Sequence, residues 1–210
     1  MKEPYRYYAL LIVAWIGAWL VYERLGLGTL SPYGTFGYWT TAKLLIWIAS
    51  ILLIGGAAWR RPVVEYLGLV RIGRGVRVGL AVCAIFVTLA ASLDVFTRSF
   101  GWPTMGPGLV NALVIAPLFE EVMFRGFALR ALQDGGYRFW TANVVAALMF
   151  LGLHLPGWYF MGALGASQVI VGVSVVLIGL TAGYAARRSK STWAAVVMHF
   201  VNNLYSAFLR

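Results

Sequence analysis

Long apolar runs separated by short polar and basic stretches are the main pattern of the chain. A helix that crosses a membrane needs about 20 mostly apolar residues to span roughly 30 Å of hydrocarbon. The pattern therefore predicts an all-α fold, a polytopic membrane helical bundle of about seven transmembrane helices. The predicted spans are Tyr7–Tyr22, Thr41–Trp59, Val76–Val95, Gly108–Ala131, Phe139–Leu155, Met161–Ala186 and Thr192–Phe208.

The first and fifth spans carry specific signals at their ends. Lys2 and Arg6 precede the first span, as basic residues precede a signal peptide, but the span is long and shows no convincing small-x-small cleavage site. We expect it to remain as a helix. Pro156 is expected to stop the fifth span.

No linker, repeat or low-complexity segment interrupts the chain, so we expect one integral-membrane domain over residues 1–210.

Composition supports the membrane interpretation and excludes a soluble protein. Hydrophobic residues make up 61% of the chain and charged residues 11%, whereas about 25% of a soluble protein is charged. Such a chain has too little polar surface to cover a soluble fold, and it is too apolar to be disordered. Its net charge of +10 would suggest nucleic acid for a soluble domain. Here the basic residues lie between apolar spans, so we expect membrane lipids as partners and no nucleic acid.

The distribution of Lys and Arg predicts the orientation of the bundle. Cytoplasmic loops carry an excess of these residues. A cytoplasmic N-terminus places most of the Lys and Arg residues of this chain on the cytoplasmic side, so we expect that orientation. Arg125 belongs to neither side because it falls inside the fourth span. The predicted outer residues are Arg24, Lys43, Arg98 and Arg210; the predicted inner ones are Lys2, Arg6, Arg60, Arg61, Arg71, Arg74, Arg77, Arg130, Arg138, Arg187, Arg188 and Lys190.

A few polar side chains lie inside the predicted spans. An ionisable residue at the centre of a membrane helix costs about 2.5–3.5 kcal/mol on insertion scales, so each one requires a reason. Both histidines of the chain are among them, whereas the single cysteine, Cys83, lies in an apolar run and is expected only to pack. The polar residues are Glu120, Glu121, Arg125, His154 and His199, with the amides Asn202 and Asn203.

The fourth span brings two of these residues together. Glu121 and Arg125 are four residues apart, so they share one face of a helix, and we expect them to be in direct contact. Glu120 points about 100° away from Glu121 and has no partner in its own helix. Pro117 removes a backbone hydrogen bond just before the acids and is expected to kink the helix.

The polar residues of three spans are expected to lie at similar depths. At about 1.5 Å per residue from the inner end of each helix, Glu120 lies roughly 18 Å deep, His154 roughly 22 Å and His199 roughly 13 Å. His199 and Asn203 also share a helical face. These depths predict one polar intramembrane cavity that all four residues share.

Two kinds of hydrolytic chemistry suit such a cavity. An unpaired carboxylate is a usable general base that takes a proton from water, and His and Asn side chains can donate hydrogen bonds to an oxyanion. Alternatively, Glu120, His154 and His199 would form a zinc site of two histidines and one carboxylate with an open position for water. No H-E-x-x-H or G-x-S-x-G motif occurs, so a zincin-like site and serine chemistry are unsupported.

The order of these residues resembles a known family. Glu120-Glu121-x-x-x-Arg125, Phe150-x-x-x-His154 and His199-x-x-x-Asn203 resemble the motifs of the CPBP intramembrane proteases. That family includes the type II CAAX prenyl endopeptidases and the bacteriocin-processing and immunity proteins, also called the Abi family. The resemblance covers residues 107–207, which we expect to form the catalytic core; residues 1–100 resemble it only as membrane spans.

The resemblance implies an endopeptidase that processes a membrane-associated peptide or protein substrate, with or without a lipid, at a CAAX-type or leader-type site. It implies that Glu120 activates water with help from His154, and that His199 and Asn203 stabilise the oxyanion. Glu121 and Arg125 would support them. A metal-free mechanism with no cofactor is favoured because Asn203 is paired with His199 on one face, and zinc is the alternative.

Two other functions use the same features. A catalytically silent immunity or peptide-binding protein would hold a peptide in the same pocket, and a proton-coupled transporter would use membrane Glu and His residues as a relay. The intact motifs favour the enzyme over the binding protein. The absence of detectable inverted repeats in the sequence weighs against the transporter.

Overall fold

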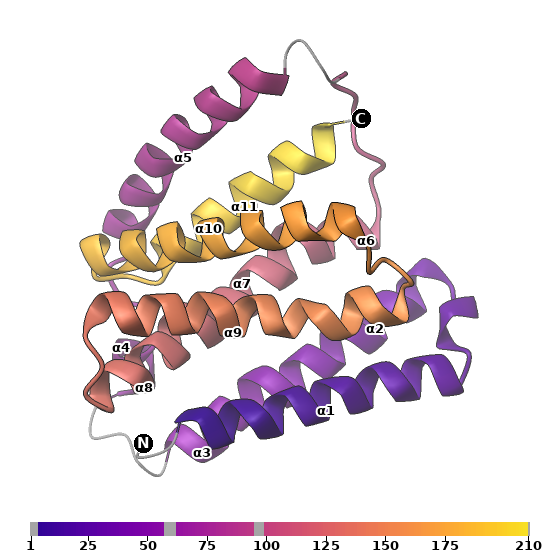
Figure 1. Cartoon of the computed structure of the whole chain (residues 1–210), viewed down its shortest axis with the longest axis horizontal. Helices are drawn as coiled ribbons and strands as arrows, with labels where there is room; N and C mark the ends of the chain where they lie inside the picture. Colours follow the sequence, from indigo (N-terminus) through magenta and orange to yellow (C-terminus); the bar gives the residue numbers. More distant parts are fainter. Residues whose placement is uncertain (1–3, 57–61, 95–98, 210) are drawn as a thin grey trace.

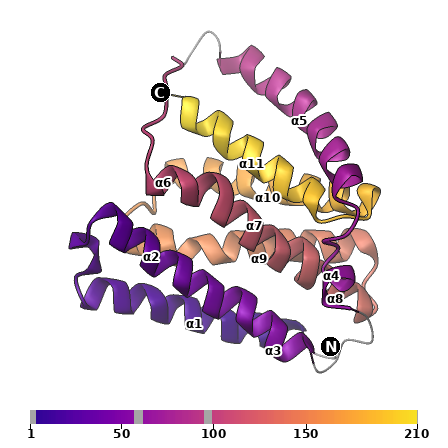
Figure 2. The ribbon, with the colours of Figure 1, turned by 180° about the vertical axis from the view of Figure 1, so that it is seen from behind.

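The computed structural model describes residues 4–56, 62–94 and 99–209, and in these ranges it contains helices and no β-strand. The predicted all-α membrane bundle is therefore confirmed. The helices α1, α9 and α10 form one layer, and α2–α3, α6–α8 and α11 lie behind them (Figures 1 and 2). The two ends of the chain lie at opposite ends of the bundle.

The N-terminal part forms a helical hairpin. Helix α1 spans Pro4–Arg24 and is followed by a short 3₁₀ turn at Leu27–Thr29. The chain then returns as one continuous helix built from α2 (Pro32–Lys43), a π-helical segment (Leu44–Ala49) and α3 (Ser50–Gly56).

The second helix begins earlier than predicted, at Pro32 and not at Thr41. Ser31 caps it, because its hydroxyl accepts a hydrogen bond from the backbone N–H of Gly34 at 3.3 Å, and Pro32 occupies the first turn, where a missing N–H costs nothing. The Tyr38 hydroxyl donates to the Ala18 carbonyl of α1 at 2.5 Å. Packing against α1 therefore extends the helix. Residues 57–59 of the predicted span lie outside the described residues.

The helix that carries the acids matches the predicted fourth span. It runs without interruption but alternates between α-helical and wider π-helical turns. Because Pro117 has no N–H, it cannot bond to the Leu113 carbonyl, and the turns just before it are π-helical. The segments are α6 (Pro107–Val110), π-helical Asn111–Ile115, α7 (Ala116–Glu121), π-helical Val122–Ala128 and α8 (Leu129–Asp134).

The predicted end of the fifth span is wrong. Helix α9 spans Phe139–Phe160 and continues through Pro156, as prolines in membrane helices can when neighbouring helices support the backbone. Here α1 supplies support, since the Tyr8 hydroxyl donates to the Met149 carbonyl at 2.6 Å and the Trp15 indole donates to the Leu153 carbonyl at 3.1 Å.

The other helices begin within a few residues of their predicted positions. Residues 161–165 form a turn that the prediction placed in the sixth span, and Val95 of the third span lies outside the described residues. The helices are α4 (Val63–Tyr66), α5 (Ile72–Asp94), α10 (Ala166–Ser189) and α11 (Trp193–Phe208).

The number of membrane crossings is established for only part of the bundle. Four described helices are long and apolar enough to cross a membrane. The other three predicted spans are also helical, but the total of seven crossings stays a prediction. The four helices are Tyr5–Arg24, Pro32–Leu53, Phe139–Phe160 and Ala166–Ser189.

Two close contacts position the helices around the acids. Helix α10 lies against α9 at Gly183, where an added Cβ would overlap the Asn143 side chain; Asn143 also donates to the Leu180 carbonyl at 2.9 Å. At the end of the bundle nearer α4, Gly126 packs on the Leu67 carbonyl, and Thr192 bonds to the same carbonyl at 2.5 Å. The segment after α4 therefore closes this end beneath the acids.

Candidate active site

Glu120 lies in the interior of the bundle with 7% of its surface exposed. It is the penultimate residue of α7, between the two π-helical segments of its helix. Its partners come from other helices: Lys43 Nζ lies 3.8 Å from Oε1, and His199 Nε2 lies 3.9 Å from Oε2. The prediction that it lacks a partner in its own helix holds, but the carboxylate is not isolated.

Lys43 corrects the sequence prediction, which counted it among the outer basic residues. It lies inside the continuous helix of residues 32–56, only 7% exposed. Its ammonium group lies 3.4 Å from Asn111 Oδ1 and 5.4 Å from the centre of the Trp47 ring. The predicted second span placed Lys43 at its outer end, so this residue was counted with the outer charges and not with the polar residues inside the spans. The helix start at Ser31-Pro32, which places Lys43 well inside the helix, was the signal that could have found it.

Glu121 and Arg125 form the predicted direct contact. Arg125 Nη1 lies 3.1 Å from Oε1 and 3.0 Å from Oε2 of the carboxylate, and the two residues are 0% and 2% exposed. The guanidinium group also lies over the Phe150 ring, 4.7 Å from its centre. Each charge of this pair is therefore compensated without water, as burial at this depth requires.

His199 joins the two glutamates across the helix interface. Its Nδ1 lies 2.9 Å from Glu121 Oε1, and because an ionised carboxylate only accepts hydrogen bonds, Nδ1 carries a hydrogen. The other ring nitrogen faces Glu120 at 3.9 Å. Helix α11 therefore aligns His199 between the paired carboxylate and the one that faces the cavity.

His154 of α9 lines the same cavity as Glu120. Its Nδ1 lies 2.8 Å from the Phe150 carbonyl oxygen; since a carbonyl only accepts, Nδ1 is the donor, and in the neutral ring Nε2 keeps its lone pair. Phe150 thus holds His154 through its backbone and Arg125 through its ring, which gives the first residue of the Phe150-x-x-x-His154 pattern a physical role.

A cavity of about 260 Å³ connects the polar groups. Glu120, His154, Lys43 and Asn111 line it, and most of the remaining wall is aromatic. Trp39, Lys43 and Trp47 come from one helix at four-residue spacing, so they form a single stripe along the cavity. The other lining residues are Trp15, Trp19, Leu153, Gly157, Trp158 and Met161.

Asn203 and His199 lie beside this cavity and are not among its lining residues. Asn203 Nδ2 donates to the Ala112 carbonyl at 2.7 Å, and its Oδ1 accepts from Asn202 at 3.2 Å. Asn203 is thus fixed against the helix that carries Glu120, one turn along α11 from His199. The predicted pairing of His199 and Asn203 on one face is observed, while their shared access to one cavity stays a prediction.

The donors of the alternative zinc site do not form a metal-binding cluster. Within residues 4–56, 62–94 and 99–209, no group of three or more His, Cys, Asp and Glu side chains is placed to hold a metal ion. The structure of these residues therefore shows no preassembled zinc site of Glu120, His154 and His199.

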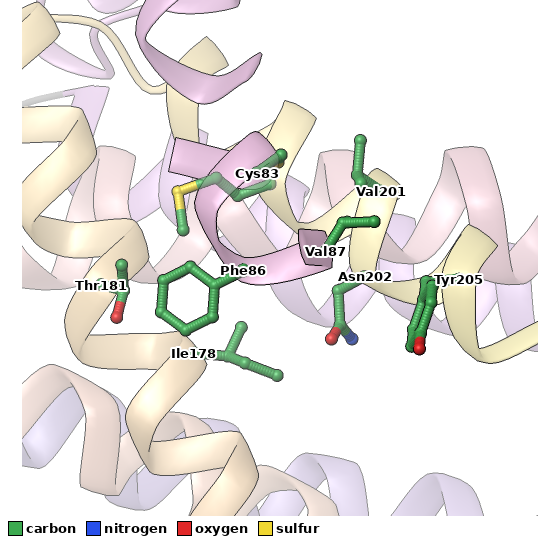
Figure 3. Close-up of a pocket in the computed structure, with 9 residues that line it drawn as sticks. Cys83, Phe86, Val87, Ile178, Thr181, Val201, Asn202 and Tyr205 are labelled. Atoms are coloured by element: carbon green, nitrogen blue, oxygen red, sulfur yellow. The ribbon is translucent and has the colours of Figure 1, made fainter. Parts of the chain in front are cut away.

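A second, smaller pocket of about 100 Å³ lies between α5, α10 and α11. Figure 3 shows Cys83 and Phe86 of α5, Thr181 of α10 and Asn202 of α11 around it. Cys83 is buried there, as predicted from its apolar surroundings. Apolar side chains dominate the walls, and among the described residues no carboxylate or imidazole lines this pocket. The ionisable side chains Glu120 and His154 line the first cavity instead.

Comparison with known proteins gives one match. Residues 101–205, half of the 210-residue chain, match the family described as type II CAAX prenyl endopeptidase Rce1-like. The matched segment contains every polar residue that the sequence analysis singled out inside the spans, and it excludes Lys43. Neither a curated protein nor a solved structure matches the chain.

Proposed function

Because the chain belongs to the type II CAAX prenyl endopeptidase Rce1-like family, we propose that it hydrolyses a peptide bond with water that is activated by Glu120. Membership of the family makes it, in general terms, an integral-membrane CAAX-type protease. The observation that carries this proposal is the position of Glu120: a buried carboxylate that faces a cavity together with a histidine. The family implies a membrane-associated peptide or protein as substrate. We extend this to a CAAX-type or leader-type cleavage site, with a prenylated substrate as the first to test.

In the proposed reaction Glu120 removes a proton from water as the water oxygen attacks the scissile carbonyl carbon. His154 orients this water through the lone pair on Nε2, since its Nδ1 is already bonded to the Phe150 carbonyl. The C–N bond then breaks, and the proton held by Glu120 passes to the leaving nitrogen. General-base assistance of this kind contributes about 10²–10⁴-fold to the rate.

His199 and Asn203 are the proposed donors to the oxyanion. With Nδ1 bonded to Glu121, His199 keeps Nε2 on the side of Glu120, where it donates when it carries a hydrogen. Asn203 uses one amide hydrogen on the Ala112 carbonyl and retains a second one. Donors held rigidly before the reaction stabilise developing charge without reorganisation, which is the main advantage of an oxyanion hole.

Glu121 and Arg125 are proposed to support the site and not to react. Arg125 compensates Glu121, and Glu121 orients His199. Because no cluster of three metal-ligating side chains is found among the described residues, we route no step through a metal and propose a cofactor-free enzyme. We also propose that the N-terminus is cytoplasmic: with Lys43 inside the bundle, the outer side retains only Arg24, Arg98 and Arg210, which strengthens the excess of inner basic residues.

Cleavage of a peptide panel by detergent-purified protein tests the proposal. The panel contains a farnesylated CAAX peptide, the same peptide without the lipid, and a leader-type peptide, each internally quenched. The wild type should cleave at least one, and Glu120→Gln, which preserves shape but cannot accept the proton, should lower kcat by about 10²–10⁴-fold. Peptide binding should survive this change.

Three outcomes contradict the proposal in different ways. Undiminished cleavage by Glu120→Gln removes Glu120 as the base. Stoichiometric zinc that tracks activity, and is lost with it on chelation, replaces the cofactor-free mechanism with a metalloprotease. Binding of a panel peptide by the wild type without any cleavage identifies the immunity or peptide-binding alternative.

A further inference from the structure

The cavity contains a cation that none of the family-matched residues supplies. Lys43 comes from the N-terminal hairpin, outside residues 101–205, yet its ammonium group lies 3.8 Å from Glu120 Oε1. A buried lysine in a membrane bundle is costly and therefore marks a functional position more often than a packing one. Packing does not require it here, because its neighbours on the same stripe, Trp39 and Trp47, line the cavity without any charge.

The charges around the site form two separate pairs. Glu121 is compensated by Arg125 at 3.0 Å, and Glu120 would be left without a cation of its own if Lys43 were absent. His199 would then be the nearest basic group, at 3.9 Å from Glu120, although its other nitrogen is already committed to Glu121. Lys43 therefore compensates Glu120 and leaves His199 available for other hydrogen bonds.

The surroundings of Lys43 hold its ammonium group in place. Asn111 Oδ1 lies 3.4 Å away on the helix that carries Glu120, and the Trp47 ring lies beneath the group at 5.4 Å, a distance at which a cation is attracted to the ring face. The ammonium group thus has a partner on each of three sides: an amide, an indole ring and the Glu120 carboxylate.

We propose that Lys43 is a positioning residue for Glu120: it holds the carboxylate on the cavity side and supplies its counter-charge. The inference rests on the proposed function, since it assigns Lys43 a role through Glu120. Lys43 does not itself touch the reacting atoms. A base displaced by about 1 Å can lose about 10²-fold in rate, so loss of Lys43 should reduce kcat to that extent.

The test compares Lys43→Met, Lys43→Arg and a control on the same helix, using the peptide that the wild type cleaves. Ser50→Ala is the matched control, because Ser50 bonds to Tyr7 at 2.8 Å and does not line the cavity. We expect Lys43→Met to lower kcat about 10²-fold with an unchanged KM and an unchanged or higher melting temperature. Lys43→Arg should recover at least about tenfold of that loss, because it restores the charge, and Ser50→Ala should keep the wild-type kcat.

Other results overturn the inference. An unchanged kcat in Lys43→Met shows that Glu120 needs no positioning cation, and a raised KM with unchanged kcat makes Lys43 a substrate contact instead. A parallel fall in melting temperature and kcat, not rescued by Lys43→Arg, makes its role structural. If Lys43→Met does not fold, Lys43→Gln is compared with Lys43→Arg by the same criteria. Lys43→Gln keeps a hydrogen-bond donor toward Asn111 but removes the charge.

Failure of the proposed function gives a different pattern from failure of this inference. If the wild type cleaves no peptide, or if Glu120→Gln is fully active, the proposed function fails. If the wild type cleaves, Glu120→Gln is inactive and Lys43→Met is fully active, only the role of Lys43 is wrong.

Discussion

The N-terminal hairpin and the family-matched segment contribute different things to one site. Residues 101–205 supply the two glutamates, both histidines, Arg125 and Asn203, and several of these side chains bond to one another. The hairpin supplies Lys43 and four of the tryptophans that line the cavity. The matched segment therefore carries the proposed reactive groups, while the hairpin forms most of the aromatic wall of the cavity.

This difference teaches how far a motif describes an active site. A motif shows which side chains lie on the same face of a helix, because their spacing along the helix is fixed. It does not show which surface encloses them, since that surface comes from a region with no recognisable pattern. Mutations can separate the two contributions, because breaking the buried pair of the matched segment should lower stability and kcat together, whereas replacing Lys43 of the hairpin should lower kcat without lowering the melting temperature.

The largest effect is expected from breaking the buried pair inside the matched segment. Arg125→Ala leaves Glu121 as an unpaired buried charge, which typically costs about 3–5 kcal/mol, and it also releases the Phe150 ring. We expect a large fall in melting temperature together with loss of cleavage. Thermal unfolding in detergent measures it, with Glu121→Gln/Arg125→Met as the matched double variant. Wild-type stability and activity in Arg125→Ala would show that the pair is dispensable.

The next largest effect concerns the proposed oxyanion donors on α11. His199→Ala and Asn203→Ala should each lower kcat by about 10²–10³-fold, the loss typical of one missing donor. Asn202→Ala is the control, because Asn202 lines the second pocket and contacts Asn203 only through one bond of 3.2 Å. Steady-state cleavage distinguishes the three variants. If Asn202→Ala were as damaging as Asn203→Ala, the assignment of Asn203 as a donor would be wrong.

The smallest effect is expected outside the spans, where α4 contacts the family-matched segment. The Tyr66 hydroxyl of α4 donates to Asp134 Oδ2 at 2.9 Å, and burial, followed by this hydrogen bond to Asp134, raises the pKa of Tyr66 above its ordinary value of 10.0. The protonated phenol is thus favoured in the folded state, so its contribution is complete below about pH 10 and is lost as the pH rises through the raised pKa.

Tyr66→Phe should therefore destabilise the protein by about 0.5–1.5 kcal/mol at neutral pH, with little change in kcat. Above about pH 10 the difference between wild type and variant should shrink, because the wild type loses the same contribution as the phenol ionises. Thermal unfolding at a series of pH values measures both effects. A difference that grows with alkaline pH would mean that the ionised form is the one favoured by folding.

The sequence predicted the elements whose patterns are local. The helical spans, the contact between Glu121 and Arg125 and the common face of His199 and Asn203 all follow from helical spacing, and all are observed. The orientation of the chain, the single domain over residues 1–210 and the roles of the site residues stay predictions. The total of seven crossings is likewise open beyond the four helices that meet the length and hydropathy of a span.

The features that sequence reasoning missed depend on contacts between distant segments. Lys43 was counted with the outer basic residues because the predicted span begins only two residues before it, at Thr41, whereas the helix begins at Pro32 and packs against α1. Pro156 was expected to end α9, but hydrogen bonds from Tyr8 and Trp15 support the helix near it. Neither contact can be deduced from the spacing of residues along one helix.

The aromatic wall of the cavity also makes the intrinsic tryptophan fluorescence of the protein a signal for binding in the cavity. Five of its nine tryptophans line the cavity beside Glu120, so much of the intrinsic fluorescence originates within a few side chains of the proposed reaction. A molecule that enters the cavity changes the surroundings of these indole rings, and we expect this to change the light they emit. Occupancy of the site can therefore be followed in unlabelled protein, even in a variant that has lost all turnover.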